Sequence, residues 1–144
     1  MKSCFITLLL MFLAGMSMGQ DRDSITHADN IPAELKLQVY YFHLTHRCNT
    51  CSTIESELRR AILEHFKAEL DEGILRLASI DCELSENEAL AKEYDAYGAT
   101  LAFTSYREGK VAKKTDLTNW AFSNIKNPES FRNGIVTKIM ELIK

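Results

Sequence analysis

The sequence predicts one α/β domain over residues 36–144, with a four-stranded mixed sheet flanked by helices. A run of β-branched and aromatic residues at 37–44 leads into an amphipathic helix, and a second apolar run of strand length follows at 74–80. Two further strand-like runs are joined by a short turn at 107–109. The expected order is therefore β-α-β-α-β-β-α. The first helix supplies the crossover that parallel strands need, and the turn makes the last two strands an antiparallel hairpin.

The first helix is predicted from apolar residues that recur at intervals of four. This stripe consists of Ile54, Leu58, Ile62, Phe66 and Leu70. Charged residues occupy the positions between them, so we expect these on the helix faces away from the core. They are Glu55, Glu57, Arg59, Arg60 and Lys67. The pattern predicts a helix that ends near Gly73 and returns the chain to the second strand.

A short helix is predicted next, at about 86–94. Ser85 and Glu88 have the spacing of a capping box, in which a serine and a glutamate three residues later satisfy free backbone N–H groups at the helix start. The residues expected on its buried side are Ala89, Leu90 and Tyr94.

The second half of the domain is predicted to be a hairpin followed by a long helix. Strands at 100–106 and 110–117 flank Arg107-Glu108-Gly109, a loop that suits a hairpin. Asn127 is the expected N-cap of the last helix, and Pro128 suits its first position because proline lacks the N–H that would be free there. The residues expected to face the core are Phe131, Ile135, Ile139 and Leu142.

The N-terminal residues 1–19 have the three parts of a secretory signal: Lys2 near the start, an apolar run, and small residues at Ser17 and Gly19. We expect cleavage after Gly19 and a secreted or periplasmic protein. The apolar run is shorter than the roughly 20 residues that span a bilayer, so no stable membrane span is expected after cleavage. Residues 20–35 are polar and are predicted to be a mobile leader.

The charge balance argues against nucleic acid as a partner. The chain has 17 basic and 20 acidic residues, and loss of Lys2 with the signal leaves 16 against 20, a net charge of −4. No basic stretch is present to bind phosphates. No glycine-rich dinucleotide motif follows a strand either, so no cofactor is expected.

The chemistry is predicted at Cys48 and Cys51, spaced C-x-x-C between a strand and a helix. Thiols at this spacing can form a disulfide across the first helical turn. Free backbone N–H groups at the helix start would stabilise a Cys48 thiolate, and Arg47 and a protonated His46 would add to this effect. A redox pair, a metal or metalloid site and a structural disulfide all fit this pattern.

Cys82 is the remaining cysteine of the expected mature chain. It follows the second strand, so it lies at the same sheet edge as the pair if the first two strands are parallel neighbours. It could then be a third ligand beside Cys48 and Cys51 for a soft metal ion or trivalent arsenic. The alternative is a buried cysteine that acts as a small hydrophobic residue.

Taken together, the element order and the C-x-x-C at the first helix resemble the thioredoxin fold in its shorter form, over about residues 36–144. More narrowly, several segments resemble a small secreted thioredoxin-like family, the ArsF-type subunit of a nitrophenyl compound nitroreductase, which is associated with resistance to aromatic arsenicals. These segments are 39–43, 47–55, 87–94, Gly109-Lys110 and Trp120. The resemblance implies that Cys48 is the attacking thiol and Cys51 the resolving thiol.

The sequence departs from thioredoxin at three places. Arg47-Cys48-Asn49-Thr50-Cys51 stands where thioredoxins have Trp-Cys-Gly-Pro-Cys, and Phe42 replaces a buried acid. Thr100, after Ala99, stands where a cis-proline is usual. Because a cis bond without proline costs about 3 kcal/mol, a trans bond is expected there. The groove beside the cysteines is therefore expected to differ from that of thioredoxin.

The sequence thus predicts an extracytoplasmic thiol-disulfide oxidoreductase or electron carrier, and the resemblance implies a subunit of a nitroaromatic or arsenical reductase system. Its partner would be a redox protein or a protein disulfide. The competing interpretations are the soft-ion site and an interaction module with a structural disulfide.

Overall fold

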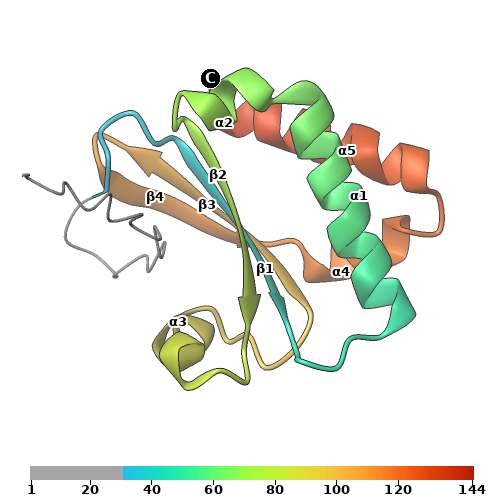
Figure 1. The fold of residues 1–144 in the computed structure, drawn as a ribbon. Helices are drawn as coiled ribbons and strands as arrows, with labels where there is room; N and C mark the ends of the chain where they lie inside the picture. Colours follow the sequence, from blue (N-terminus) through green and yellow to red (C-terminus); the bar gives the residue numbers. More distant parts are fainter. Residues whose placement is uncertain (1–30) are drawn as a thin grey trace, which may run out of the picture.

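Four strands form one mixed sheet in the spatial order β2-β1-β3-β4 (Figure 1). The computed structural model describes residues 31–144, so the predicted signal at 1–19 lies outside the described residues. The strands are β1 (Leu37–His43), β2 (Leu75–Asp81), β3 (Thr100–Arg107) and β4 (Lys110–Asp116). β1 is parallel to β2 and antiparallel to β3, and β3 and β4 form an antiparallel hairpin. The predicted mixed sheet is confirmed.

The hairpin turn explains the sharp reversal between β3 and β4. Glu108 and Gly109 both have positive φ angles, 52° and 70°. Positive φ at both central residues is the requirement of the type I′ turn, whose twist matches that of the flanking strands. A glycine at the second of these positions meets this requirement without strain.

Helices cover both faces of the sheet, but unequally (Figure 1). The helices are α1 (Asn49–His65), α2 (Lys67–Asp71), α3 (Glu88–Glu93), α4 (Thr118–Asn124) and α5 (Pro128–Leu142). α1 and α5 pack side by side over one face, and α3 lies against the other. Among the described residues, no helix is long and apolar enough to cross a membrane.

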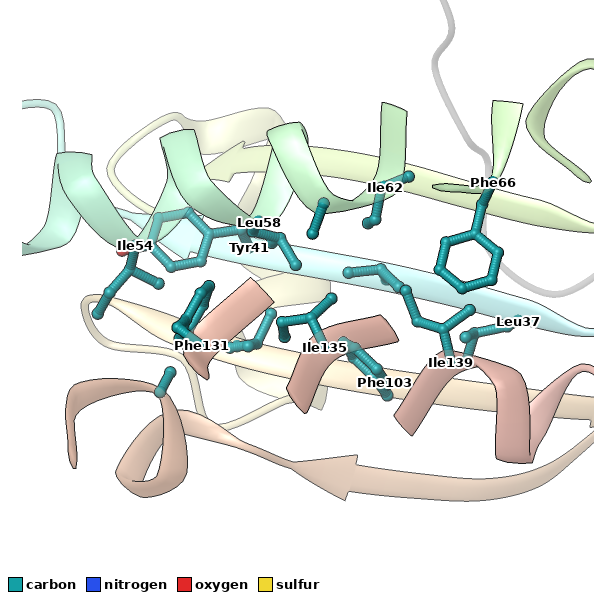
Figure 2. Close-up of a cluster of buried hydrophobic side chains, with 14 of the residues drawn as sticks. Leu37, Tyr41, Ile54, Leu58, Ile62, Phe66, Phe103, Phe131, Ile135 and Ile139 are labelled. Carbon is teal, nitrogen blue, oxygen red and sulfur yellow. The ribbon is translucent and has the colours of Figure 1, made fainter. Parts of the chain in front are cut away.

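The larger core lies between the sheet, α1 and α5 (Figure 2). Ile54, Leu58 and Ile62 of α1 are fully buried, as the stripe predicted. Phe131, Ile135 and Ile139 of α5 face them and are also fully buried. Fully burying side chains of this size contributes about 1.5–3 kcal/mol each. A smaller cluster around Tyr40, Phe42 and Leu90 joins α3 to the other face of the sheet.

The start of α5 is confirmed at the residues that predicted it. The Asn127 side chain accepts a hydrogen bond from the Ser130 backbone N–H, at 3.1 Å, and Pro128 occupies the first helical position. The cap satisfies one of the free N–H groups and fixes where the helix begins.

Three local predictions were wrong. The first helix breaks at Phe66, which leaves helical geometry at φ −132° while its ring stays buried, so α2 continues separately. The expected capping box does not form, because residues 85–87 make a 3-10 turn and α3 begins only at Glu88. Its buried residues are Leu90 and Ala91, and Ala89 is exposed. The helix α4 was not predicted.

Candidate thiol-disulfide site at the start of α1

Cys48 and Cys51 form a disulfide across the first turn of α1, with their Cα atoms 5.1 Å apart. Cys48 is the N-cap residue, with extended backbone angles, and its Sγ accepts a hydrogen bond from the Cys51 backbone N–H at 3.1 Å. The strand β1 ends at His43, so five residues carry the chain from the sheet to the helix. The predicted placement of the pair between strand and helix is confirmed.

The two sulfurs differ in their access to solvent. Cys48 is exposed, whereas Cys51 is partly buried inside the helix. The Tyr41 hydroxyl donates a hydrogen bond to the Cys51 carbonyl at 2.8 Å. Burial raises the pKa of Tyr41 to about 12, so its phenol stays protonated and remains a donor at neutral pH. A bulky disulfide or thiol from solution can therefore reach Cys48 more readily than Cys51.

The backbone around Cys48 suits a thiolate. In the oxidised form its sulfur already takes the place of a capping oxygen on the N–H of Cys51. When the disulfide opens, the same N–H and the positive end of the helix dipole face the Cys48 sulfur. These groups favour the charged form, which is the nucleophile in disulfide exchange.

Arg47, which we expected to add positive charge beside Cys48, is itself bound to an acid. Its guanidinium donates to the Glu55 carboxylate and to His43 Nε2. Glu55 was predicted on an outer face of the helix, but it is only 7% exposed. Its other oxygen binds Arg59, with Oε1 3.0 Å from Nη2. The one sequence signal for this arrangement is the spacing of Glu55, four residues after Cys51 and four before Arg59.

The two histidines near the pair lie in different surroundings. His43 is 7% exposed and its Nδ1 lies 2.9 Å from the Leu44 carbonyl oxygen, within the fold as expected. His46 is exposed on the turn before Cys48. The turn itself is held by Thr45, whose Oγ1 donates to Asp81 at 2.8 Å and whose N–H donates to Glu83 at 2.7 Å.

Cys82 is a free, partly buried thiol. Its backbone N–H donates to the His43 carbonyl at 2.8 Å, and its side chain packs against the smaller core cluster. Burial raises the pKa of the Cys82 thiol. Within residues 31–144, no three His, Cys, Asp or Glu side chains are grouped so that they could hold a metal ion. The described structure thus does not assemble the alternative site from Cys48, Cys51 and Cys82.

The remaining predicted site residues lie at the sheet end that carries the cysteines. Thr100 begins β3 opposite Phe42, near the end of β1. Every peptide bond in the described part of the chain is trans, including the bond before Thr100, as expected. Ala99 is partly buried against the larger core cluster, and Phe42 is fully buried in the smaller one.

No family model matches the chain, and no curated protein is significantly similar to it in sequence. Solved structures are similar in fold. Human ERp44 in its zinc-bound form is 12% identical with a TM-score of 0.52, and the match covers 78% of this chain but only 28% of ERp44. Fasciola hepatica thioredoxin is 20% identical with a TM-score of 0.43, over 71% of this chain and 80% of its own. The oxidised mitochondrial thioredoxin 3 of Saccharomyces cerevisiae is 23% identical with a TM-score of 0.41, over 72% of this chain and 79% of its own. The chain has a thioredoxin-like fold, and it spans about a quarter of ERp44.

Proposed function

We propose that this protein is an extracytoplasmic thiol-disulfide oxidoreductase that carries electrons through Cys48 and Cys51. The observation that carries the proposal is the exposed Cys48 sulfur at the N-cap of α1, hydrogen-bonded to the Cys51 N–H and joined to a less exposed Cys51. This is the asymmetry that a two-step exchange needs, because one sulfur must meet the partner and the other must release it.

The reaction begins with the reduced pair. The Cys48 thiolate attacks one sulfur of a partner disulfide, the partner's S–S bond breaks, and its other sulfur leaves as a thiolate that takes up a proton. Cys51 then gives up its proton and attacks Cys48 Sγ, which releases the second partner thiolate. Two electrons have passed to the partner, and the Cys48–Cys51 disulfide remains. A dithiol protein must reduce this disulfide before the next cycle.

The cellular setting is a further part of the proposal. The charged, apolar and small-residue order of residues 1–19 supports export. The resemblance to the ArsF-type family supports a role beside a nitroaromatic or arsenical reductase. In such a system this protein would be the electron carrier, because its sequence has no glycine-rich dinucleotide motif with which to carry out nitro reduction itself.

Turnover of insulin disulfides by residues 20–144, with dithiothreitol as the electron donor, tests the proposal. Wild type is expected to accelerate insulin reduction, and Cys48→Ser to abolish the acceleration, because a hydroxyl has no thiolate form at neutral pH. Cys82→Ala is the matched control, since it removes a thiol outside the pair and should leave turnover nearly unchanged.

Binding of trivalent arsenic and zinc to the same three proteins separates the proposal from the soft-ion interpretation. The redox proposal fails if wild type shows no turnover but binds either ion stoichiometrically, and if Cys82→Ala loses that binding. No turnover and no ion binding would favour a structural disulfide instead.

A further inference from the structure

We propose that Glu55 is a positioning residue that sets the acidity of the Cys48 thiol by holding and neutralising Arg47. The inference rests on the proposed function, because it names the residue that would tune the exchange reaction. Glu55 lies one helical turn beyond Cys51, on the same side of α1. In this proposal Glu55 does not touch either sulfur. It acts through Arg47, the residue that precedes Cys48.

Both oxygens of Glu55 are occupied by guanidinium groups. Oε2 binds Arg47, and Oε1 binds Arg59 at 3.0–3.1 Å. The Glu55 side chain is only 10% exposed, whereas those of Arg47 and Arg59 are 31% and 47% exposed. A buried carboxylate is stable only when it is paired and hydrogen-bonded. Glu55 therefore holds the Arg47 side chain in one place next to the turn that carries Cys48.

His43 secures Arg47 from the other side, and its two contacts indicate which ring nitrogen faces each partner. The Leu44 carbonyl can only accept, so the His43 Nδ1 facing it carries the proton. A guanidinium can only donate, so Nε2 facing Arg47 is without a proton. The charged groups around this turn are Arg47, Arg59 and Glu55, together with Asp81 and Glu83, which accept hydrogen bonds from Thr45. Asp81 also interacts electrostatically with Arg47.

Arg47, Arg59 and Glu55 form one linked group that carries one net positive charge, from two arginines and one carboxylate. Replacing Glu55 with glutamine removes the negative charge paired with Arg47, the residue before Cys48, and leaves Asp81 and Glu83 in place. The thiolate of Cys48 would then be favoured and its pKa would fall. A more stable thiolate stabilises the reduced form, so the disulfide would become more oxidising. In the native protein, Glu55 therefore restrains the oxidising strength of the pair.

The experiment titrates Cys48 by pH-dependent alkylation, followed by mass spectrometry, in Glu55→Gln and in the matched control Glu57→Gln. Glu57 lies on the same helix and is also paired and partly buried, but its partner is Arg132 of α5. Glu55→Gln is expected to lower the midpoint of the Cys48 titration by about one pH unit, which is a tenfold increase in the ionisation constant of the thiol. It should also shift the equilibrium with glutathione about tenfold toward the dithiol. Glu57→Gln should change neither.

A third variant keeps the test decisive if Glu55→Gln folds poorly. Arg47→Gln leaves the Glu55–Arg59 pair intact, removes the cation next to Cys48 in the sequence, and is expected to raise the midpoint of the Cys48 titration. If Glu55 is purely structural, Glu55→Gln will lower the urea midpoint of unfolding but change neither the Cys48 titration nor the equilibrium with glutathione. That result overturns the proposal. Equal midpoints for Glu55→Gln and Glu57→Gln overturn it as well. The titration needs no insulin turnover, so its outcome is separate from that of the proposed function.

Discussion

At the scale of the residue, three cysteines of the same chemistry have three different environments. Cys48 is exposed at a helix N-cap, Cys51 is partly buried within the helix, and Cys82 is packed against the smaller core. Backbone N–H groups favour ionisation of the first, whereas burial raises the pKa of Cys82. The three thiols should therefore begin to react at different pH values.

Alkylation of the reduced protein with iodoacetamide tests this separation. Cys48 is expected to react first at mildly acidic pH. Cys82 should react only at higher pH, because burial raises the pKa of its thiol and the neutral form persists in the folded protein. Peptide mapping after short reaction times measures the extent of alkylation at each cysteine. Labelling of Cys51 ahead of Cys48 would contradict the proposed roles.

The residues around the pair were less predictable than the pair itself. The C-x-x-C between a strand and a helix indicated the disulfide and its position, since both depend on local spacing. The pairing of Arg47 with Glu55 was not predicted, because periodicity assigned Glu55 to an outer face. The burial of Glu55 depends on the direction in which the turn before Cys48 points the Arg47 side chain. Sequence spacing does not contain that information.

At the scale of the element, α4 and α5 meet through an aromatic contact. Trp120 of α4 stacks on Phe131 of α5, with ring centroids 5.4 Å apart. The indole also lies over Gly134, where an added Cβ would be 2.5 Å from Trp120 Cζ2. Gly134 thus permits the close approach of the two helices, in spite of the cost of glycine in a helix interior.

Gly134→Ala is therefore expected to destabilise the protein, although alanine is the better helix former. The propensity gain is about 1 kcal/mol, whereas overpacking costs about 1–3 kcal/mol, and the packed indole cannot move aside freely. Urea unfolding measures the difference. Gly98→Ala is the control, because no atom lies within 4 Å of its added Cβ and the change should be within about 0.5 kcal/mol. A gain in stability for Gly134→Ala would show that Trp120 repacks without cost.

Elements marked by an apolar run, a helical stripe or a clear turn were predicted well, and those without such a signal were not. β1, β2 and β3 had apolar runs of strand length, and α5 had a helical apolar pattern and a clear cap residue. β4 has mostly exposed residues and no such pattern, and it was predicted from the turn at 107–109. α4 spans only seven residues and has one fully buried side chain, Ala121, so no stripe marks it. The capping box failed because the Asn87 side chain donates to the Asp81 carbonyl at 2.9 Å, in a 3-10 turn that the spacing of Ser85 and Glu88 did not indicate.

At the scale of the whole molecule, the sheet separates a large core from a small one. α1 and α5 bury most of the apolar side chains on one face, whereas α3 covers the sheet end near the cysteines on the other (Figure 1). The start of α1 is thus anchored by the larger core through Ile54, three residues after Cys51. The site stands at the start of a helix that contributes Ile54, Leu58 and Ile62 to the larger core.

The export proposal concerns the whole molecule too, and it remains a prediction. The protein recovered from its native host is expected to begin at Gln20, because the small residues before that position suit a signal peptidase. Intact-mass spectrometry measures this directly. A protein that still carries Met1 or the apolar run would contradict the assignment of residues 1–19.

The unequal exposure of the two sulfurs has a kinetic consequence. Because Cys48 is the accessible atom of the pair, the protein that donates electrons and the protein that accepts them must meet it at the same spot, one after the other. Neither can occupy that spot while the other is there, so no complex of all three proteins lies on the reaction path. Steady-state rates with both partners varied should then give the parallel double-reciprocal lines of a ping-pong scheme.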